Sequence, residues 1–449
     1  MVGWRTVRAA VAVSALAVTS GCGDDAGGEG ETEGSGPSTD ASTGDSSGAD
    51  EPSEPAPGEE DAGSLASDIA VLRVEVNQGS AIAVVDDGVL LEPTEHVELV
   101  PGRPGVLRVY WQTEPSFEAR DIEARLLLLD AAGERTLSRQ VLSIAGPPDA
   151  SSLDGTFTFA LDETTLAEGM AFSVGLFEVG GTSSGASESG ARVPAQGQAE
   201  LGVATGPMTL RVMLVPVTPP GDPGLPISEE ERETLALRLH ERFPTSSVEV
   251  TVRDPMPHPS VIGDVAEVLD PLIEQRVADI QAGLEGADWD VYYHAVLNLD
   301  ACCTEGVSGG YGLTDVGGGK GETRVSSSAA HPGDFVRDGW LVAHEIGHNH
   351  GISHAPCGVG DSDPQYPHAD ALLGAQGYDI TTGALIDAAS THDLMSYCSP
   401  SWSSDYAWEK FTRRVRTLNS WANESSAPPP SPRAAGVGVA CPQHSRRSP

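Results

Sequence analysis

Apolar residues follow two different patterns along the chain, and the pattern changes near position 205. From Ser67 to about Thr205, short runs of branched and apolar residues are separated by Gly, Pro and Asp, which is typical of strands joined by turns. About seven strands fit this stretch, so we expect an all-β, immunoglobulin-like sandwich over residues 66–205. The clearest runs are Val71–Val76, Val106–Trp111, Ala124–Leu129, Thr156–Leu161 and Phe172–Val179.

Residues 206–423 alternate strand-like and helical runs, which predicts a separate α/β domain and hence a multidomain protein. Leu210–Val217 is expected to be a strand. Ser228, with Glu231 three residues later, forms a capping box that begins a helix ending before Pro244. Further expected elements are strands at Val248–Val252 and Val291–Leu299, and helices at Val261–Ala282, within Asp334–His350 and after Ser404.

The N-terminus has the features of a targeting segment. Arg5 and Arg8 precede an apolar run, Ala9–Val18, that is too short to span a bilayer, which predicts a signal peptide over residues 1–22. The small residues directly before Cys22 resemble a bacterial lipobox, in which the cysteine is lipidated. We therefore expect an exported lipoprotein of the bacterial cell envelope, at the outer membrane or cell surface, with plain secretion as the alternative.

Two further segments lack the composition of a folded domain. Residues 23–65 are acidic, almost without apolar side chains and without Lys or Arg, so we expect a disordered tether; a partner-binding acidic tail is the alternative. Residues 424–449 are Pro- and Ser-rich and are expected to be a disordered tail. The net charge of −40 argues against nucleic acid and against direct binding to anionic lipid, so a lipid anchor would be the membrane contact. We expect a monomer.

The strongest candidate for chemistry is a histidine cluster near position 350. Helical positions four apart lie about 40° apart around the axis, so His344 and His348 can bind one Zn²⁺ ion while Glu345 lies beside them as a general base. Gly351 can adopt positive φ, end the helix and turn His354 toward the same ion. A fourth position would stay open for water, as catalytic zinc requires. Three purely structural histidines are the alternative interpretation.

The spacing His-Glu-x-x-His-x-x-Gly-x-x-His resembles the signature of the metzincin zinc endopeptidases. In that family a methionine lies in a tight turn beneath the metal, and Asp393–Cys398 resembles this turn, with Met395 as its structural floor. Tyr397 matches a tyrosine that in some branches ligates zinc at rest and stabilises the oxyanion. Ala355 differs from the residues that mark the astacin-like, reprolysin-like and serralysin-like branches, so the branch stays open, with bacterial mucin-cleaving and reprolysin-like members nearest. The resemblance covers about Leu341–Ser399.

The resemblance implies an exported zinc endopeptidase that hydrolyses protein or glycoprotein substrates, with Glu345 as general base and Tyr397 aiding the oxyanion. It also implies that Gly309–Leu313 is the glycine-rich edge strand along which an extended peptide aligns. The alternative function is a surface-tethered binding lipoprotein with a non-catalytic metal domain. For residues 66–205 we expect a spacer or a pro-region that is moved aside; a module that binds substrate or glycan is the alternative.

Cysteine placement suggests one disulfide near the metal. If the metzincin resemblance holds, the turn after the third histidine and the methionine turn meet beneath one ion, so we expect Cys357 and Cys398 to pair. The pairing of Cys302, Cys303 and Cys441 is left open.

Two other features near the motif are less specific. His350 leaves the helix on a different face from His348, so we expect it not to bind the metal. The polar loop after the motif contains residues that can bind calcium or simply be solvated. These residues are Asp361, Asp363, His368 and Asp370.

Overall fold

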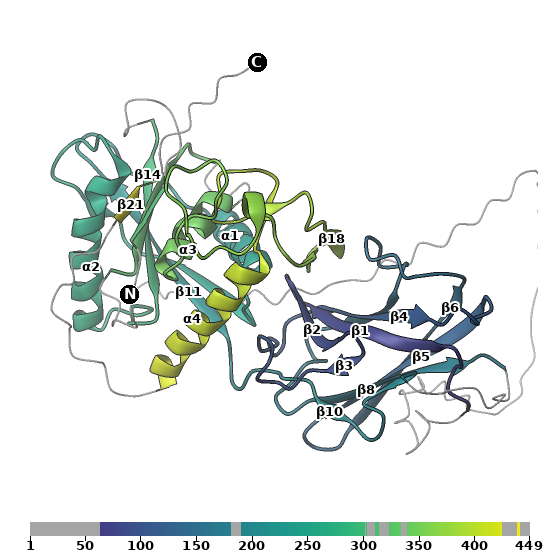
Figure 1. The fold of residues 1–449 in the computed structure, drawn as a ribbon. Coiled ribbons are helices and arrows are strands. Elements are labelled where there is room, and N and C mark those ends of the chain that lie inside the picture. The colour runs from purple at the N-terminus through teal and green to yellow at the C-terminus, as the bar shows by residue number, and fades with distance from the viewer. Residues whose placement is uncertain are drawn as a thin grey trace, which may run out of the picture.

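The computed structural model contains two folded parts that lie side by side (Figure 1). We call them the β-domain (residues 66–205) and the α/β domain (residues 206–423, whose sheet also includes a short strand at Gly438–Ala440). The predicted signal peptide with Cys22, nearly all of the predicted tether, and Cys303 and Cys441 lie outside the described residues. Within the part that is described, no helix combines the length and the apolar character needed to cross a membrane. The described residues are 63–180, 190–300, 302, 310–313, 323–333, 339–423 and 438–440.

The β-domain consists of two antiparallel sheets packed face to face. Its strands are β1 (Ile69–Asn77), β2 (Ala81–Asp86), β3 (Val89–Leu90), β4 (Gly105–Thr113), β5 (Arg120–Leu129), β6 (Arg135–Ile144), β7 (Phe157–Leu161), β8 (Ala171–Glu178), β9 (Arg192–Val193) and β10 (Ala199–Glu200). One sheet has the order β3-β2-β1-β4-β7, and the other has the order β10-β8-β5-β6 with β9 on β8. Alternate side chains such as Val74, Leu107, Leu126 and Val174 meet in one buried core between the sheets.

Strand β6 shows why the sequence pattern predicted fewer strands than the structure contains. It is the edge strand of its sheet, and only Ile144 among its ten residues is buried, so it has no run of apolar residues. Its pairing with β5 runs over the full length, from Arg120 opposite Ile144 to Leu129 opposite Arg135. Strand β6 therefore forms because it pairs with β5, and its own composition would not predict it. The immunoglobulin-like topology stays a prediction.

The α/β domain is built on one mixed sheet with the order β12-β11-β14-β16-β15-β21. The first four strands in this order run parallel to their neighbours, and β15 is antiparallel to β16. The strands are β11 (Thr209–Thr218), β12 (Ser247–Val252), β14 (Tyr292–Asn298), β15 (Gly310–Leu313), β16 (Val325–Ala330) and β21 (Gly438–Ala440), with the short β13 (Met256–Pro257) on β11. The helices are α1 (Glu229–Arg242), α2 (Leu269–Ala282), α3 (Trp340–Asn349) and α4 (Asp405–Asn423), with the 3₁₀ turn η2 (Val265–Val268) before α2.

Helices cover both faces of this sheet, and the apolar side chains of β11 point alternately toward the two layers of helices. Val212 and Leu214 pack with α1, α3 and α4 in one core, whereas Met213 and Val215 pack with η2 and α2 in another. Helix α1 begins at the expected capping box, in which Ser228 accepts a hydrogen bond from the backbone of Glu231 and the Glu231 side chain accepts one in return. Helix α2 begins later than the sequence pattern indicated, because the 3₁₀ turn η2 precedes it, whereas α3 lies within the expected Asp334–His350.

The predicted peptide-aligning strand is not the outermost strand of the described sheet. Gly310–Leu313 forms β15 as expected, and its inner edge pairs with β16. Its outer edge pairs with β21, so that Gly312 lies opposite Val439 from the C-terminal tail. The chain itself therefore occupies the edge that the resemblance assigned to an extended peptide.

The segment between α3 and α4 is held by small paired elements and a disulfide. Cys357 and Cys398 are joined, with 5.7 Å between their Cα atoms, as expected. The bond ties the turn after α3 to the segment just before α4. The small elements are η3 (Ala369–Ala371), β17 (Gly377–Asp379), β18 (Ala384–Ile386), β19 (His392–Asp393) and β20 (Ser401–Trp402); β17 pairs with β18, and β19 with β20.

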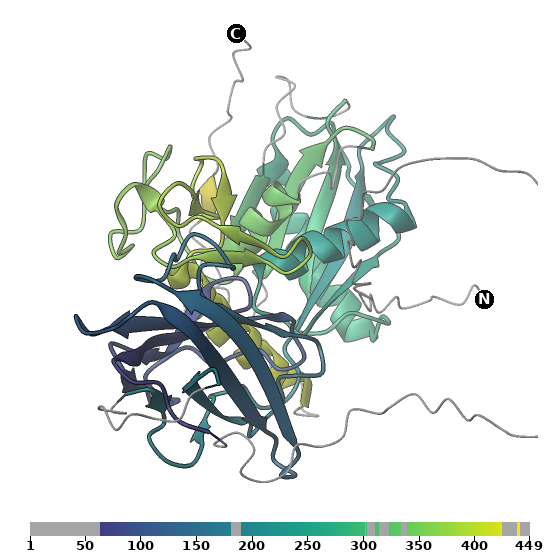
Figure 2. The same cartoon turned by 90° about the vertical axis from the view of Figure 1, so that its right-hand side faces the viewer.

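Helix α4 lies beside the β-domain in both ribbon views (Figures 1 and 2), and the two domains share a buried interface there. Trp408 of α4 is part of the core of the β-domain. Arg103 of the β-domain is fully buried, lies over the Trp408 ring, and donates hydrogen bonds to the carbonyl oxygens of Thr245 (3.1 Å) and Glu241 (3.3 Å). Leaving a buried guanidinium without such partners would lower the free energy of unfolding. A loosely attached spacer or a removable pro-region would not need a buried, hydrogen-bonded interface of this kind.

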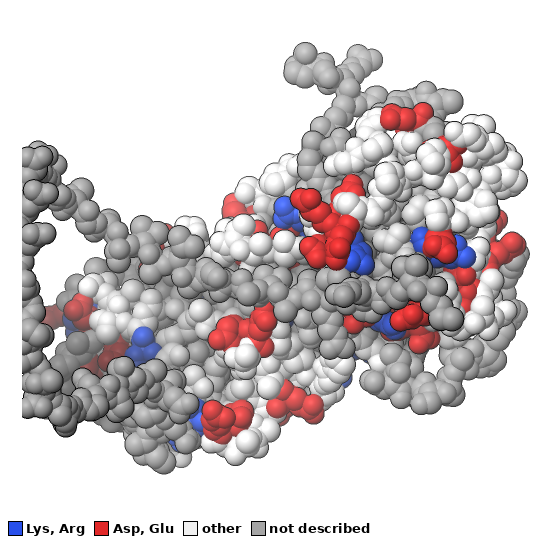
Figure 3. Space-filling model, turned by 180° about the vertical axis from the view of Figure 1, so that it is seen from behind, with Lys and Arg blue, Asp and Glu red and all other residues white. Residues whose placement is uncertain are grey.

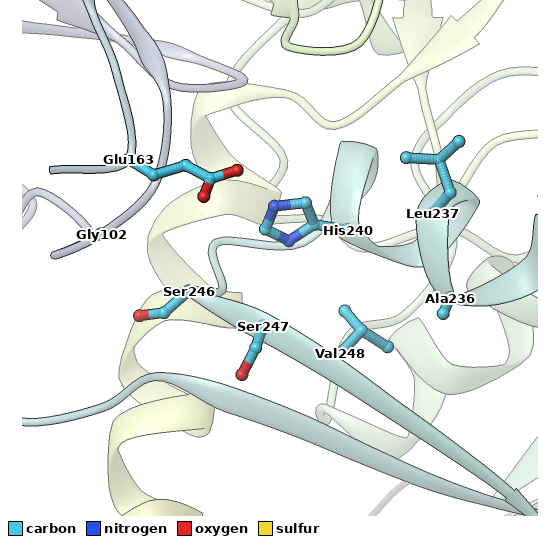
Figure 4. Close-up of a pocket in the computed structure, with 8 residues that line it drawn as sticks. All are labelled: Gly102, Glu163, Ala236, Leu237, His240, Ser246, Ser247 and Val248. Carbon is cyan, nitrogen blue, oxygen red and sulfur yellow. The ribbon is translucent and has the colours of Figure 1, made fainter. Parts of the chain in front are cut away.

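A small pocket opens at the same interface (Figure 4). Gly102 and Glu163 of the β-domain face His240 of α1 and Ser246 across it. Burial and the nearby guanidinium of Arg103 lower the pKa of His240 well below its ordinary value. The imidazole of His240 is therefore neutral, and its Nδ1 accepts a hydrogen bond from Arg103 (3.2 Å). The pocket belongs to the packing between the domains.

Acidic side chains are spread over the surface. Figure 3 shows them on both domains of the face that it draws, with basic side chains only here and there between them. This distribution agrees with the net charge of −40. It gives the described surface on this side no broad basic patch of the kind that binds nucleic acid.

A buried histidine should make the stability of the α/β domain depend on pH. His294 is fully buried between Ser326 and Ser328, whose hydroxyl groups lie 2.7 and 2.8 Å from its ring nitrogens, and burial lowers its pKa to about 3. In the unfolded chain the His294 imidazole takes up a proton as the pH falls through about 6.5, whereas in the folded chain it stays neutral down to about pH 3. The free energy of unfolding is therefore unaffected by the titration of His294 above pH 6.5 and decreases as the pH falls from 6.5 toward 3. The loss between pH 6.5 and 5 should be about 2 kcal/mol.

Denaturant unfolding in the presence of a chelator, at several pH values, measures this contribution. His294→Gln should flatten the dependence by about that amount. His331→Gln, at an exposed position beside Asp300, is the comparison variant for the substitution itself. An equally steep dependence in His294→Gln would contradict the assignment.

Candidate metal centre

Helix α3 brings the first two histidines of the motif to one face and fixes their rings. His344, Glu345 and His348 are all fully buried. The Nδ1 of His344 donates to the backbone carbonyl of Leu394 (2.8 Å), and the Nδ1 of His348 donates to that of Ile352 (2.8 Å). A carbonyl can only accept, so these bonds place the proton on Nδ1 and leave a lone pair on Nε2. Both rings therefore present Nε2 as a metal ligand.

The turn after α3 brings in the third histidine. Gly351 has φ +83°, as expected for a residue that ends the helix, and the chain then returns toward the site. The Nε2 of His354 lies 3.2 Å from the Nε2 of His348. The candidate ligand atoms of His344, His348 and His354 all lie within 4.8 Å of one another. The sequence motif thus becomes one compact group of three imidazoles.

The atoms at the centre of this group fit a metal ion. The Nε2 of His344 is buried and has no hydrogen-bond partner among the described residues, which is costly unless a ligand occupies the position. Burial, the first cause, lowers the pKa of His348 to about 3 and also lowers the pKa values of His344 and His354. The rings are therefore neutral, which is the form that binds metal. Three neutral imidazoles are the ligand set of a catalytic zinc site with an open fourth position.

The methionine turn packs against α3 and contacts the His344 ring through the carbonyl of Leu394. Met395 is fully buried, and its sulfur lies directly against α3 at Gly347, where a Cβ atom would collide with it. Asp393 holds this turn. Its Oδ1 accepts from the backbone N–H of Met395 (2.7 Å), and its Oδ2 accepts from that of Ser404 (3.1 Å). Burial raises the pKa of the Asp393 carboxyl.

Asp393 was not singled out by the sequence, although it opens the motif that contains Met395. Its carboxylate links the methionine turn to Ser404, whose hydroxyl accepts a hydrogen bond from Ala407 in the first turn of α4. One side chain therefore joins the methionine turn to the helix that packs on the β-domain. A short polar residue just before a buried turn was the available signal.

Tyr397 and Glu345 lie at the same group of imidazoles. The hydroxyl of Tyr397 is 3.2 Å from the Nε2 of His354, and its ring centroid is 5.6 Å from that of His344. Glu345 is fully buried in α3, next in sequence to His344. The structure thus brings Tyr397 to the three imidazoles and carries Glu345 next to His344 in the same buried helix.

The remaining sequence candidates lie apart from the three imidazoles. The ring of His350 stacks between Phe243 and Tyr292, with centroid distances of 5.1 Å to each, and its Nδ1 donates to the carbonyl of Ile346. His350 is therefore a core residue, and its place outside the histidine group agrees with the expectation that it does not bind the metal.

Two of the four proposed calcium ligands are engaged by other side chains. Asp363 accepts hydrogen bonds from Tyr406 (2.7 Å) and Lys410 (3.3 Å), and His368 lies 2.7 Å from Asp405. Among the described residues, the loop supplies no group of three possible metal ligands. Calcium binding stays a prediction without support from these contacts.

A second cluster with ligand-type atoms lies near the metal centre. The sulfur atoms of Cys357 and Cys398 and a ring nitrogen of His392 come within 4.8 Å of one another. The disulfide uses both sulfur atoms, so this cluster does not offer thiolate ligands in the present structure.

Comparison with known proteins supports a peptidase. A family model described as Peptidase M66 matches residues 296–427, which include α3, His354 and Met395. The match supports a metallopeptidase that hydrolyses peptide bonds, and it covers less than a third of the chain. No curated protein matches the chain.

One matching solved structure is a cycloisomaltooligosaccharide glucanotransferase from Paenibacillus sp. in complex with cycloisomaltoheptaose. The sequence identity is 11%, and the match covers 51% of this chain and 28% of that chain with a TM-score of 0.17. This chain thus spans less than a third of the length of that enzyme. A likeness at this TM-score carries no argument about fold or function.

The contact between Gly347 and Met395 predicts an unusual effect of a helix-favouring substitution. Gly347→Ala should gain about 1 kcal/mol from helix propensity, yet the new methyl group collides with the Met395 sulfur, so we expect a net loss of about 1 to 3 kcal/mol in the free energy of unfolding. In a Met395→Ala background the same substitution should be neutral or stabilising. Denaturant unfolding of the four proteins tests this, and a stabilised Gly347→Ala single variant would contradict it.

Proposed function

We propose that the chain is a zinc-dependent endopeptidase of metzincin type. The observation that carries this proposal is the convergence of three neutral imidazoles, two of them oriented by backbone carbonyls, on a helix that carries Glu345 and packs on the buried Met395. The match to the Peptidase M66 model supports peptide-bond hydrolysis and does not favour a binding protein without catalysis. His344, His348 and His354 would hold the ion. A zinc ion bound there would polarise the scissile carbonyl and acidify a water molecule.

The side chains of the site can carry the proton transfers. Glu345 would take a proton from the attacking water and deliver it to the leaving amine, which is the role of a general base that becomes a general acid. Its burial beside the histidines lowers the local dielectric and strengthens these interactions. The hydroxyl of Tyr397 would donate a hydrogen bond to the oxyanion that develops on the scissile carbonyl.

The remaining assignments rest on sequence alone. The N-terminal segment with Cys22 supports an exported lipoprotein, tethered at the outer membrane or cell surface or else secreted. Such a location would give the peptidase protein or glycoprotein substrates outside the cell. A monomer with one lipid anchor and no nucleic-acid partner is the simplest form consistent with the acidic chain.

Replacing the general base should separate metal binding from catalysis. Glu345→Ala removes the carboxylate but no ligand, so zinc content should stay at one ion per chain while cleavage of an unfolded protein falls by at least about 100-fold. Metal analysis and a protein digest measure the two effects. Glu409→Gln, at a half-exposed position of α4 where the carboxylate pairs with Arg413, is the control and should digest normally. A wild-type protein that holds no stoichiometric zinc would refute the proposal.

Removing the tyrosine hydroxyl should slow the chemical step and leave substrate binding almost unchanged. Tyr397→Phe keeps the ring that lies against His344 and His354 but loses the donor, so kcat should fall by about 100-fold with little change in KM. Steady-state kinetics on a peptide substrate provides both constants. An unchanged kcat would exclude Tyr397 from oxyanion stabilisation.

A further inference from the structure

A continuous path of hydrogen bonds connects the β-domain to the ring of His344. The Nδ1 of His344 donates to the carbonyl of Leu394 (2.8 Å), and the N–H of Leu394 donates to the carbonyl of Trp402 (2.6 Å). The indole Nε1 of Trp402 then donates to the carbonyl of Gly79, between β1 and β2 of the β-domain (2.7 Å). Each step is a direct contact between atoms of buried or nearly buried residues.

The β-domain end of this path is held rigidly. Asn77 is fully buried; its Oδ1 accepts from the N–H of Gly79 (3.1 Å) and its Nδ2 donates to the carbonyl of Gln376 (2.9 Å). Ser80 forms a bridge with Gly377 at the start of β17. The turn that presents the Gly79 carbonyl is therefore fixed to both domains.

The other end of the path is equally restricted. Trp402 is 5% exposed, the guanidinium of Arg242 lies over its ring at 5.3 Å, and its strand β20 pairs with β19 just before the methionine turn. A shift of Trp402 would therefore move Leu394, whose carbonyl fixes both the tautomer and the direction of the His344 ring. Groups that orient a ligating histidine affect metal affinity even though they do not touch the metal.

We propose that Trp402 is a positioning residue of the metal centre, through which the β-domain holds the His344 ring in its ligating orientation. The inference rests on the proposed function in that it takes His344 to be a metal ligand. It assigns the β-domain a role that differs from a spacer, a pro-region or a substrate-binding module. The β-domain is then a permanent part of the peptidase.

The test removes one N–H group and measures metal retention. Trp402→Phe keeps an aromatic ring but loses the donor to Gly79, so zinc should transfer to a competing chelator about threefold to tenfold faster than from the wild type. The d–d absorption spectrum of the cobalt-substituted protein should also shift, because the ligand field depends on the direction of the His344 ring. Asn77→Ala, which loosens the same turn from the β-domain side, should shift both readouts in the same direction.

Two controls distinguish the path from general loosening of the fold. Ser246→Ala removes another side-chain hydrogen bond across the domain interface, from Ser246 to the carbonyl of Pro101 (2.8 Å). Trp289→Phe removes a buried indole N–H that has no hydrogen-bond partner in the described part of the chain. Both controls should retain zinc and the cobalt spectrum of the wild type.

The outcomes are distinguishable. Faster zinc loss and a shifted spectrum in Trp402→Phe, with both controls unchanged, support the inference. The positioning role is overturned if the wild type binds zinc and Trp402→Phe loses zinc at the same rate with the same cobalt spectrum. It is also overturned if Ser246→Ala changes both readouts as strongly as Trp402→Phe does. In either case the proposed function stands. If the wild type binds no zinc, the proposed function fails and this inference fails with it.

Discussion

The metal centre depends on backbone carbonyl groups that orient imidazole rings. A histidine can ligate through either ring nitrogen, and without a fixed partner its ring rotates and exchanges tautomers. Here the carbonyls of Leu394 and Ile352 hold the Nδ1 protons of His344 and His348, so both Nε2 atoms point toward one position. Three neutral rings can then be buried together, because a metal ion compensates for the polar atoms that they leave unsatisfied.

Much of the surrounding fold serves to place those two carbonyls. Ile352 follows the turn at Gly351, whose positive φ ends α3 and returns the chain toward the metal. Leu394 precedes the buried Met395, and the disulfide between Cys357 and Cys398 ties the two turns together. Asp393 and Trp402 extend this support to α4 and to the β-domain. The site thus lies within the α/β domain, and contacts from both domains support it.

The sequence was sufficient for the parts of the site that local spacing determines. Four-residue helical spacing and a glycine at the end of α3 predicted the three-histidine group, and the family resemblance supplied Met395, Tyr397 and the disulfide. Features that depend on contacts between segments far apart in the chain could not be predicted from the sequence. Strand β6 forms through its pairing with β5. Asp393 acquires its role because the fold buries it against Ser404. The role of Trp402 depends on its hydrogen bond to the carbonyl of Gly79, more than three hundred residues earlier in the chain.

Zinc-edge X-ray absorption spectroscopy of the purified, zinc-loaded chain tests the central claim most directly, because it measures both the kind and the distance of the ligand atoms. The account predicts about three nitrogen ligands at about 2.0 to 2.1 Å, with the remaining coordination from a light atom and no contribution from sulfur. Sulfur at about 2.3 Å would place the metal on Cys357 and Cys398 instead of on the three histidines. That result, or the absence of bound zinc, would contradict the account.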